Sequence, residues 1–143
     1  MLLKRTSLIL TLAFALGLAG TASAAASAPG HDSLLIRHQM RGCHTWSANG
    51  GAFKVSQSVT LRHGGWLAVT NNDVMPHTLV LTSGPALRIA HPKLGHMGAS
   101  LKITLTKPGV YHFTTKPGDD YGYMAGMKTT GEDNVLKLTV IVS

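Results

Sequence analysis

The chain has 143 residues, enough for one ordinary domain and short for two, and its formal net charge is +7. A hydrophobic share of 44% with 16 glycines excludes a disordered chain and indicates a compact, turn-rich protein. A single Cys beside eight His and six Met excludes a disulfide scaffold and a Cys-only zinc module, and leaves His and Met as the abundant metal-binding residues.

The N-terminal segment has the pattern of a secretory signal peptide. Two basic residues precede an uncharged run from Thr6 to Leu18, and small residues follow up to Ala24. This run has 13 residues, whereas a transmembrane helix needs roughly 18, so a membrane anchor is the weaker alternative. We therefore expect residues 1–24 to be a signal peptide, the mature protein to have no membrane span, and its location to be periplasmic or secreted.

The rest of the chain is expected to hold a short leader and one domain. Residues 25–32 begin with Ala, Ser, Pro and Gly and are predicted to be a flexible leader, and residues 33–143 are predicted to form the domain. Signal-peptide removal lowers the net charge from +7 to about +5. The remaining basic residues stand singly, which argues against nucleic-acid binding and favours acidic partners or membrane surfaces.

Short runs with strand-type composition recur through the domain, and turn residues such as Gly64-Gly65 and Pro108-Gly109 separate them. No amphipathic stretch is long enough for a substantial helix, so the pattern predicts an all-β antiparallel sandwich or barrel. The last run is mostly apolar, which predicts a central strand. The seven runs are 34–38, 53–61, 66–70, 78–82, 101–106, 110–115 and 135–142.

Two segments resemble the cupredoxins, the blue copper proteins. The stretch from Val69 to Leu79 is similar to the segment in which a strand ends in Asn and a Pro-His pair supplies the first copper ligand. The stretch from Lys107 to Phe113 is similar to the family's penultimate strand. The resemblance implies a cupredoxin-like Greek-key β-sandwich of about seven to eight strands, copper as the cofactor, and His77 as the first ligand. Taken alone, His77 can instead be a histidine hydrogen-bonded to the preceding Asn/Asp turn.

The segment before the last strand departs from the family's pattern. Cupredoxins with a blue site place Cys just after Tyr-x-Phe, then His, then usually Met, whereas this chain has Thr, then Asp119, then Met124 or Met127. A hydroxyl gives none of the thiolate bonding of a blue site, so the usual centre cannot form here. Met124 or Met127 is a candidate weak ligand or a core residue. Asp119 is a candidate oxygen ligand, a residue that orients His77, or a turn residue.

The only thiol lies elsewhere, at Cys43 in the segment 40–46 between the first two predicted strands. In the cupredoxin fold this loop lies at the same end of the sandwich as the Pro-His ligand, so the resemblance allows Cys43 to approach His77. A buried structural thiol and an intermolecular disulfide are the alternatives. His44 can bind the same ion only if the chain turns sharply near Gly42, because neighbours in extended chain point to opposite faces.

A second small group, with His91, His96 and Met97, lies on a loop that in cupredoxins can also reach the copper end. His96 or Met97 is a candidate to complete the coordination shell or to form a weaker surface site, and His91 is expected to be solvated. The other histidines lack ligand-like spacing and are assigned to the surface or to strands: His31, His38, His63 and His112.

Enzymatic motifs are absent from the sequence. It contains no nucleophile elbow, phosphate loop, dinucleotide fingerprint or zinc-protease motif. Its adjacent acidic pairs, Asp119-Asp120 and Glu132-Asp133, are typical of solvated turns rather than of acid/base catalysis. We therefore expect a protein that is not an enzyme.

Two hypotheses follow from the sequence. The first is a periplasmic or secreted copper-binding protein with a rearranged site, in which His77 and Cys43 act with a Met or a second His. It would serve electron transfer or copper handling, with a redox or copper-delivery protein as partner. The second is a metal-free cupredoxin-like binding or assembly module of the cell envelope, motivated by the missing Cys and His of the ligand loop.

Overall fold

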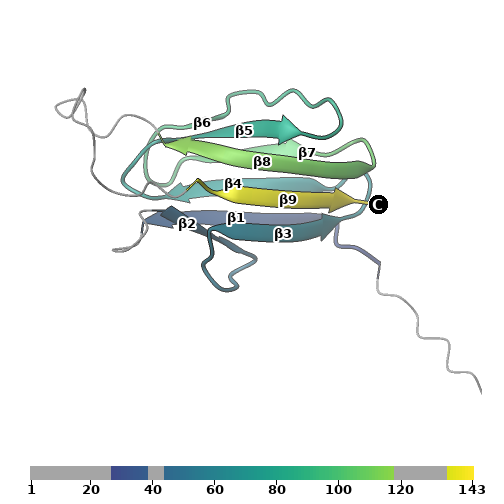
Figure 1. The fold of residues 1–143 in the computed structure, drawn as a ribbon, viewed down its shortest axis with the longest axis horizontal. Coiled ribbons are helices and arrows are strands. Elements are labelled where there is room, and N and C mark those ends of the chain that lie inside the picture. Colours follow the sequence, from purple (N-terminus) through teal and green to yellow (C-terminus); the bar gives the residue numbers. More distant parts are fainter. Residues whose placement is uncertain (1–26, 39–43, 118–134) are drawn as a thin grey trace, which may run out of the picture.

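The computed structural model describes residues 27–38, 44–117 and 135–143, which form nine strands in two sheets and no helix (Figure 1). The four-stranded sheet has the order β2 (His44–Ala48), β1 (His31–His38), β4 (Trp66–Asn72), β7 (Ser100–Thr104). The five-stranded sheet has the order β3 (Ser56–Leu61), β9 (Lys137–Val142), β8 (Gly109–Pro117), β5 (His77–Ser83), β6 (Lys93–Leu94). The predicted all-β sandwich is confirmed. In this part of the chain, no helix is long and apolar enough to cross a membrane.

Both sheets are mixed, so the expectation of purely antiparallel sheets was wrong for two strand pairs. β1 runs parallel to β4, and β3 runs parallel to β9, while the other neighbours are antiparallel. The β1–β4 register places Arg37 opposite Asn72. The C-terminal ends of these two strands therefore meet at the same edge of the sandwich.

Alternation of inward and outward side chains explains most of the strands. In β4 the inward positions Leu67 and Val69 are buried, and in β9 the inward positions Leu138 and Val140 are buried. As expected from its apolar composition, β9 is a central strand, between β3 and β8. The first strand begins at His31, so it includes the last two residues of the predicted leader.

Two strands were not predicted. β2 lies in the segment around Cys43 that was interpreted as a loop, and four of its five residues are buried, so it shows no alternation. It is held by antiparallel pairing with β1 and by a bridge between Trp46 and Lys54. β6 has two residues and pairs with the start of β5.

The core draws apolar side chains from both sheets, including Ile36, Leu67, Leu79, Phe113 and Val140. Toward one end of the sandwich the inward positions become polar. The buried polar residues that continue the inward rows of β2, β4, β5 and β8 at this end are His44, Asn71, His77 and Thr115. The candidate site lies in this polar layer, at the end of the apolar core.

Candidate metal centre

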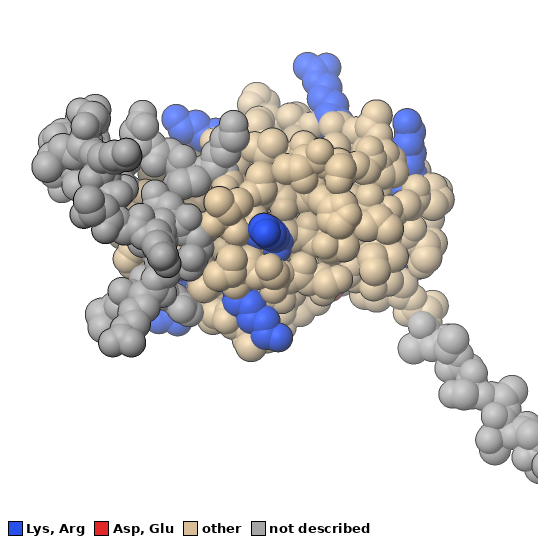
Figure 2. Space-filling view, viewed as in Figure 1, with Lys and Arg blue, Asp and Glu red and all other residues tan. Residues whose placement is uncertain are grey.

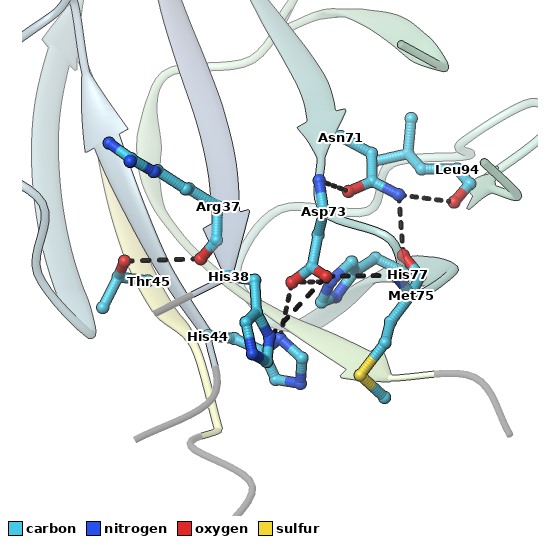
Figure 3. A network of polar contacts seen from close by, with 9 residues as sticks. All are labelled: Arg37, His38, His44, Thr45, Asn71, Asp73, Met75, His77 and Leu94. Atoms are coloured by element: carbon cyan, nitrogen blue, oxygen red, sulfur yellow. Dashed lines mark hydrogen bonds and ion pairs between the residues drawn. The ribbon is translucent and has the colours of Figure 1, made fainter. Parts of the chain in front are cut away.

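Side chains from three parts of the four-stranded sheet and from β5 converge at the polar end of the sandwich (Figure 3). His44 begins β2, Asp73 follows the end of β4, and His77 begins β5. Their exposed fractions are 1%, 0% and 0%, so all three are closed off from solvent. His38 ends β1 and lies at the rim, with its side chain 48% exposed.

The turn between β4 and β5 holds Asp73 in place. The Asp73 backbone N–H donates to Asn71 Oδ1 at 2.8 Å, and the Met75 N–H donates to Asp73 Oδ1 at 3.0 Å. Asn71 Nδ2 donates to the carbonyls of Met75 at 2.8 Å and Leu94 at 3.2 Å. Asn and Asp suit such turns because their short side chains bond nearby backbone groups. The carboxylate is therefore fixed by groups from β4, the turn and β6.

Two histidines meet this carboxylate at one oxygen. The His44 Nδ1 lies 2.8 Å from Asp73 Oδ2, and the His77 Nε2 lies 3.4 Å from the same atom. The two rings also pack edge to face, with centroids 4.8 Å apart. His38 Nδ1 is 3.9 Å from Asp73 Oδ1, which is beyond hydrogen-bond distance. His77 thus has the contact with the Asn/Asp turn that was weighed against a ligand role.

The second nitrogen of the His77 ring, Nδ1, is one of the few buried polar atoms without a hydrogen-bond partner among the described residues, as are Trp46 Nε1 and Thr114 Oγ1. Buried polar atoms in folded proteins are almost always paired, so an unpaired ring nitrogen of this kind needs an explanation, and metal ligation is one that its chemistry allows. A neutral imidazole nitrogen is a good ligand for copper and zinc.

Burial and charge shift the pKa of two groups here. Burial lowers the pKa of His77 below its usual 6.5, and the charge of His44 lowers it further, against the opposing contact with Asp73. Burial alone would raise the pKa of Asp73, but the hydrogen bonds from Met75 and His44, with smaller contributions from the charge of His44 and from His77, lower it below the usual 3.8. These directions favour a neutral His77 ring beside an ionised carboxylate.

The ligand-capable atoms of His38, His44 and Asp73 lie within 4.8 Å of one another. His77 adds a further imidazole, in ring contact with His44. The described donors are thus mainly nitrogens, which suit copper, zinc or nickel better than magnesium or calcium.

The structure describes four of the eight candidate ligands, His44, His77, His96 and Met97, of which Met97 is 53% exposed. It brings His44 and His77 together, as the hypothesis of a shared site requires. His96 is exposed, and its Nδ1 lies 2.9 Å from the Met97 carbonyl, outside the group around Asp73. The other four candidates lie outside the described residues: Cys43, Asp119, Met124 and Met127.

Chain connectivity relates two of these candidates to the described site. Cys43 immediately precedes His44, and Asp119 follows two residues after Pro117, whose backbone is paired with His77.

Sequence reasoning missed His38 and gave Asp73 only the part of a hydrogen-bond partner. His38 was assigned to the surface because no fixed partner was evident. The parallel register of β1 and β4 supplies that partner, since His38 and Asp73 are the residues that follow the paired Arg37 and Asn72. His38 and Asp73 could have been paired from the sequence because β1 and β4 both end in polar residues. This inference would have required knowing that the two strands run parallel.

No family model and no curated protein matches the chain. Among solved structures, it is similar to a purple cupredoxin from Nitrosopumilus maritimus, with 17% identity and a TM-score of 0.45, over 78% of this chain and 98% of that one. It is similar to a variant of amicyanin in the reduced state, with 15% identity and a TM-score of 0.42, over 78% and 82%. It is also similar to a multicopper oxidase from Campylobacter jejuni, with 13% identity and a TM-score of 0.48, over 79% of this chain and 25% of that one.

Proposed function

We propose that the chain is an exported copper-binding protein of the cupredoxin type whose site is rearranged around His77. The supporting observation is the burial and hydrogen bonding of the His77 ring. The ring is fully buried, its Nε2 lies against Asp73, and its Nδ1 has no hydrogen-bond partner among the described residues. Such a nitrogen is preorganised to bind an ion, because no protein donor among the described residues has to be displaced from it.

In this proposal Cys43 is the second ligand, and a Met or a second His completes the site. Cys43 directly precedes His44, whose ring packs against His77. In this proposal the chain turns sharply near Gly42, since neighbours in extended chain point to opposite faces. The further candidates are Met124, Met127, His96 and Asp119. Imidazole with thiolate favours copper over hard cations, with zinc as the competitor. Copper, when bound, supplies a one-electron couple, and the chain's own residues orient it and exclude water.

The proposed role is electron transfer or copper handling with a protein partner, rather than catalysis. Among residues with described side chains the only carboxylates are Asp32 and Asp73, which are 5% and 0% exposed, and Asp32 accepts a hydrogen bond from Asn49. Neither is available to a substrate for acid/base chemistry. The segment 1–24 supports export to the periplasm or outside the cell.

The surface supports an acidic partner. All eight basic side chains for which exposure is described are exposed, and the Lys and Arg side chains visible in Figure 2 stand apart from one another rather than in one patch. A field of this kind accelerates encounters with acidic proteins. The eight are Arg37, Lys54, Arg62, Arg88, Lys93, Lys102, Lys107 and Lys137.

Copper titration of the mature chain tests the proposal. We expect the wild type to retain stoichiometric copper through dialysis, and a variant with both Cys43→Ser and His77→Ala to lose it. His112→Ala, which removes an exposed histidine of β8, is the matched control and should retain copper. Equal retention by the double variant would overturn the rearranged site. No binding at micromolar copper, under reducing and oxidising conditions, would favour the metal-free module instead.

Spectroscopy separates the two roles of a copper-loaded protein. An intense visible thiolate-to-Cu(II) band supports electron transfer at a site that contains Cys43. A site that stays colourless and takes only Cu(I) supports copper carriage and rejects the redox role.

A further inference from the structure

The carboxylate of Asp73 is fully committed to N–H donors. Oδ1 faces the Met75 N–H at 3.0 Å, and Oδ2 faces ring nitrogens of His44 at 2.8 Å and His77 at 3.4 Å. Its exposed fraction is 0%, so water does not compete for these positions. An ionised carboxylate only accepts hydrogen bonds, so each ring nitrogen that faces it must carry the proton.

This requirement fixes the tautomers of the two rings in opposite senses. A neutral imidazole has one N–H and one lone pair. His44 faces Asp73 with Nδ1, so in its neutral form its proton is on Nδ1 and its lone pair is on Nε2. His77 faces Asp73 with Nε2, so its proton is on Nε2 and its lone pair is on the buried Nδ1.

We propose that Asp73 is a positioning residue of the metal site: through one shared oxygen it holds His44 and His77 in opposite tautomers and so presents Nδ1 of His77 to the ion. This inference rests on the proposed function and adds to it the residue that sets the tautomers of both rings. With Asp73 committed to N–H donors, the described part of the site offers nitrogen rather than oxygen. It therefore takes copper or zinc and does not take magnesium or calcium.

The geometry argues against Asp73 as a ligand itself, although a carboxylate oxygen of Asp73 lies within 4.8 Å of ring nitrogens of His38 and His44. An ion on Asp73 Oδ2 would have to displace the His44 and His77 N–H groups, and an ion on Oδ1 would compete with the Met75 N–H. Histidine ligands commonly donate their second ring N–H to a carboxylate, and that is the arrangement found here.

The first test needs neither a metal nor a variant of Asp73. Side-chain 15N–1H correlation spectra of the metal-free mature chain report which ring nitrogen of each histidine is protonated. His44→Gln and His77→Gln variants assign the two rings. We expect the Nδ1–H tautomer for His44 and the Nε2–H tautomer for His77. The same tautomer on both rings, or the reverse pair, would overturn the inference.

The second test replaces the carboxylate by an isosteric amide in Asp73→Asn. The amide offers one oxygen acceptor and an N–H₂ donor, so it cannot accept from both rings and at least one tautomer must reverse. We expect copper affinity to fall about 10- to 100-fold, as for other lost outer partners of ligands. Asp32→Asn is the matched control, since Asp32 is also buried but lies near the other end of β1, and it should leave affinity and tautomers unchanged.

The outcomes separate this inference from the proposed function. Wild-type copper affinity in a folded Asp73→Asn variant would overturn the positioning role and leave copper binding intact. If the Asp73→Asn variant lost copper binding while both tautomers stayed unchanged, Asp73 would act as a ligand, and this result would also overturn the positioning role. A wild type that binds no copper would refute the proposed function, and a protein without a metal site has no metal-positioning residue, so the inference would fall with it.

Discussion

His44 and His77 pack edge to face across the two sheets, with ring centroids 4.8 Å apart and planes at 89°. His44 belongs to β2 of the four-stranded sheet, and His77 belongs to β5 of the five-stranded sheet. Their contact therefore joins the two layers at one end of the sandwich. Since both rings also reach Asp73, this end is held by polar contacts where the rest of the core is apolar.

His77→Ala should weaken copper binding far more than His96→Ala. The first change removes a buried imidazole whose Nδ1 is unpaired among the described residues, whereas His96 is exposed and bonded to the Met97 carbonyl. We expect His77→Ala to cost more than the roughly 10- to 100-fold typical of an outer partner. Competition titrations with a copper chelator measure both constants. A large loss in His96→Ala alone would place the site on the other loop.

The metal-free chain should lose stability as the pH falls below about 6.5. The pKa of His77 is lowered in the folded state by burial and by the charge of His44, so the unfolded chain binds a proton first. Stability then decreases from pH 6.5 down to the folded pKa of His77. The pKa of Asp73 is also lowered, so its contribution is present above pH 3.8 and is lost as the pH falls through its folded value.

Urea midpoints measured between pH 8 and pH 3 check this prediction. His77→Gln should flatten the curve over the interval below pH 6.5 and above the lowered folded pKa of His77, because glutamine does not titrate. A wild-type midpoint that stays constant or rises over that interval would contradict the direction given for His77.

Gly84→Ala should destabilise the fold, and Gly95→Ala should not. Gly84 has φ +123°, and a Cβ there would lie 2.6 Å from the Val110 carbonyl oxygen. Backbone strain of this kind costs about 1 to 3 kcal/mol before the clash is relieved. At Gly95 the nearest atom to a Cβ is the flexible Cε of Lys93 at 3.8 Å, so we expect a change within about 0.5 kcal/mol. Thermal unfolding of the two variants gives the comparison, and equal midpoints would contradict the prediction.

Within β9, Leu138→Ala should cost about 2 to 5 kcal/mol in the free energy of unfolding, because Leu138 is 1% exposed in the core between the sheets. Ile141→Ala on the same strand is the control. Ile141 is 40% exposed on the outer face, so its truncation should cost well under half as much. Denaturant unfolding of both variants measures the difference, and similar costs would place the core on the other face of β9.

The sequence predicts strands where one face is buried and the other is more accessible to solvent. β4, β5, β8 and β9 alternate in this way, and their predicted ranges overlap the observed ones. β2 escapes prediction because four consecutive residues are buried and the period-two signal vanishes. The parallel pairs β1–β4 and β3–β9 escape it because sheet order depends on connections that local composition does not record.

Only the part of the candidate site that lies in a local sequence motif was predicted. The Pro-His pair, through its resemblance to the first ligand segment of cupredoxins, made His77 a candidate ligand, and proline restricts the backbone just before it. His38 and Asp73 are far apart in the sequence and come together only through the parallel register of β1 and β4. The shared oxygen of Asp73 depends on the packing of two sheets, which no short motif specifies.

Because His44 and His77 belong to different layers, an ion bound at this end would couple metal occupancy to the unfolding equilibrium. The unfolded chain separates the rings and lacks the site, so the ion binds the folded state alone. By mass action, free ion at 1,000 times its dissociation constant would then add about 4.1 kcal/mol to the free energy of unfolding. The thermal midpoint of such a copper-binding protein would therefore report the free copper concentration around it.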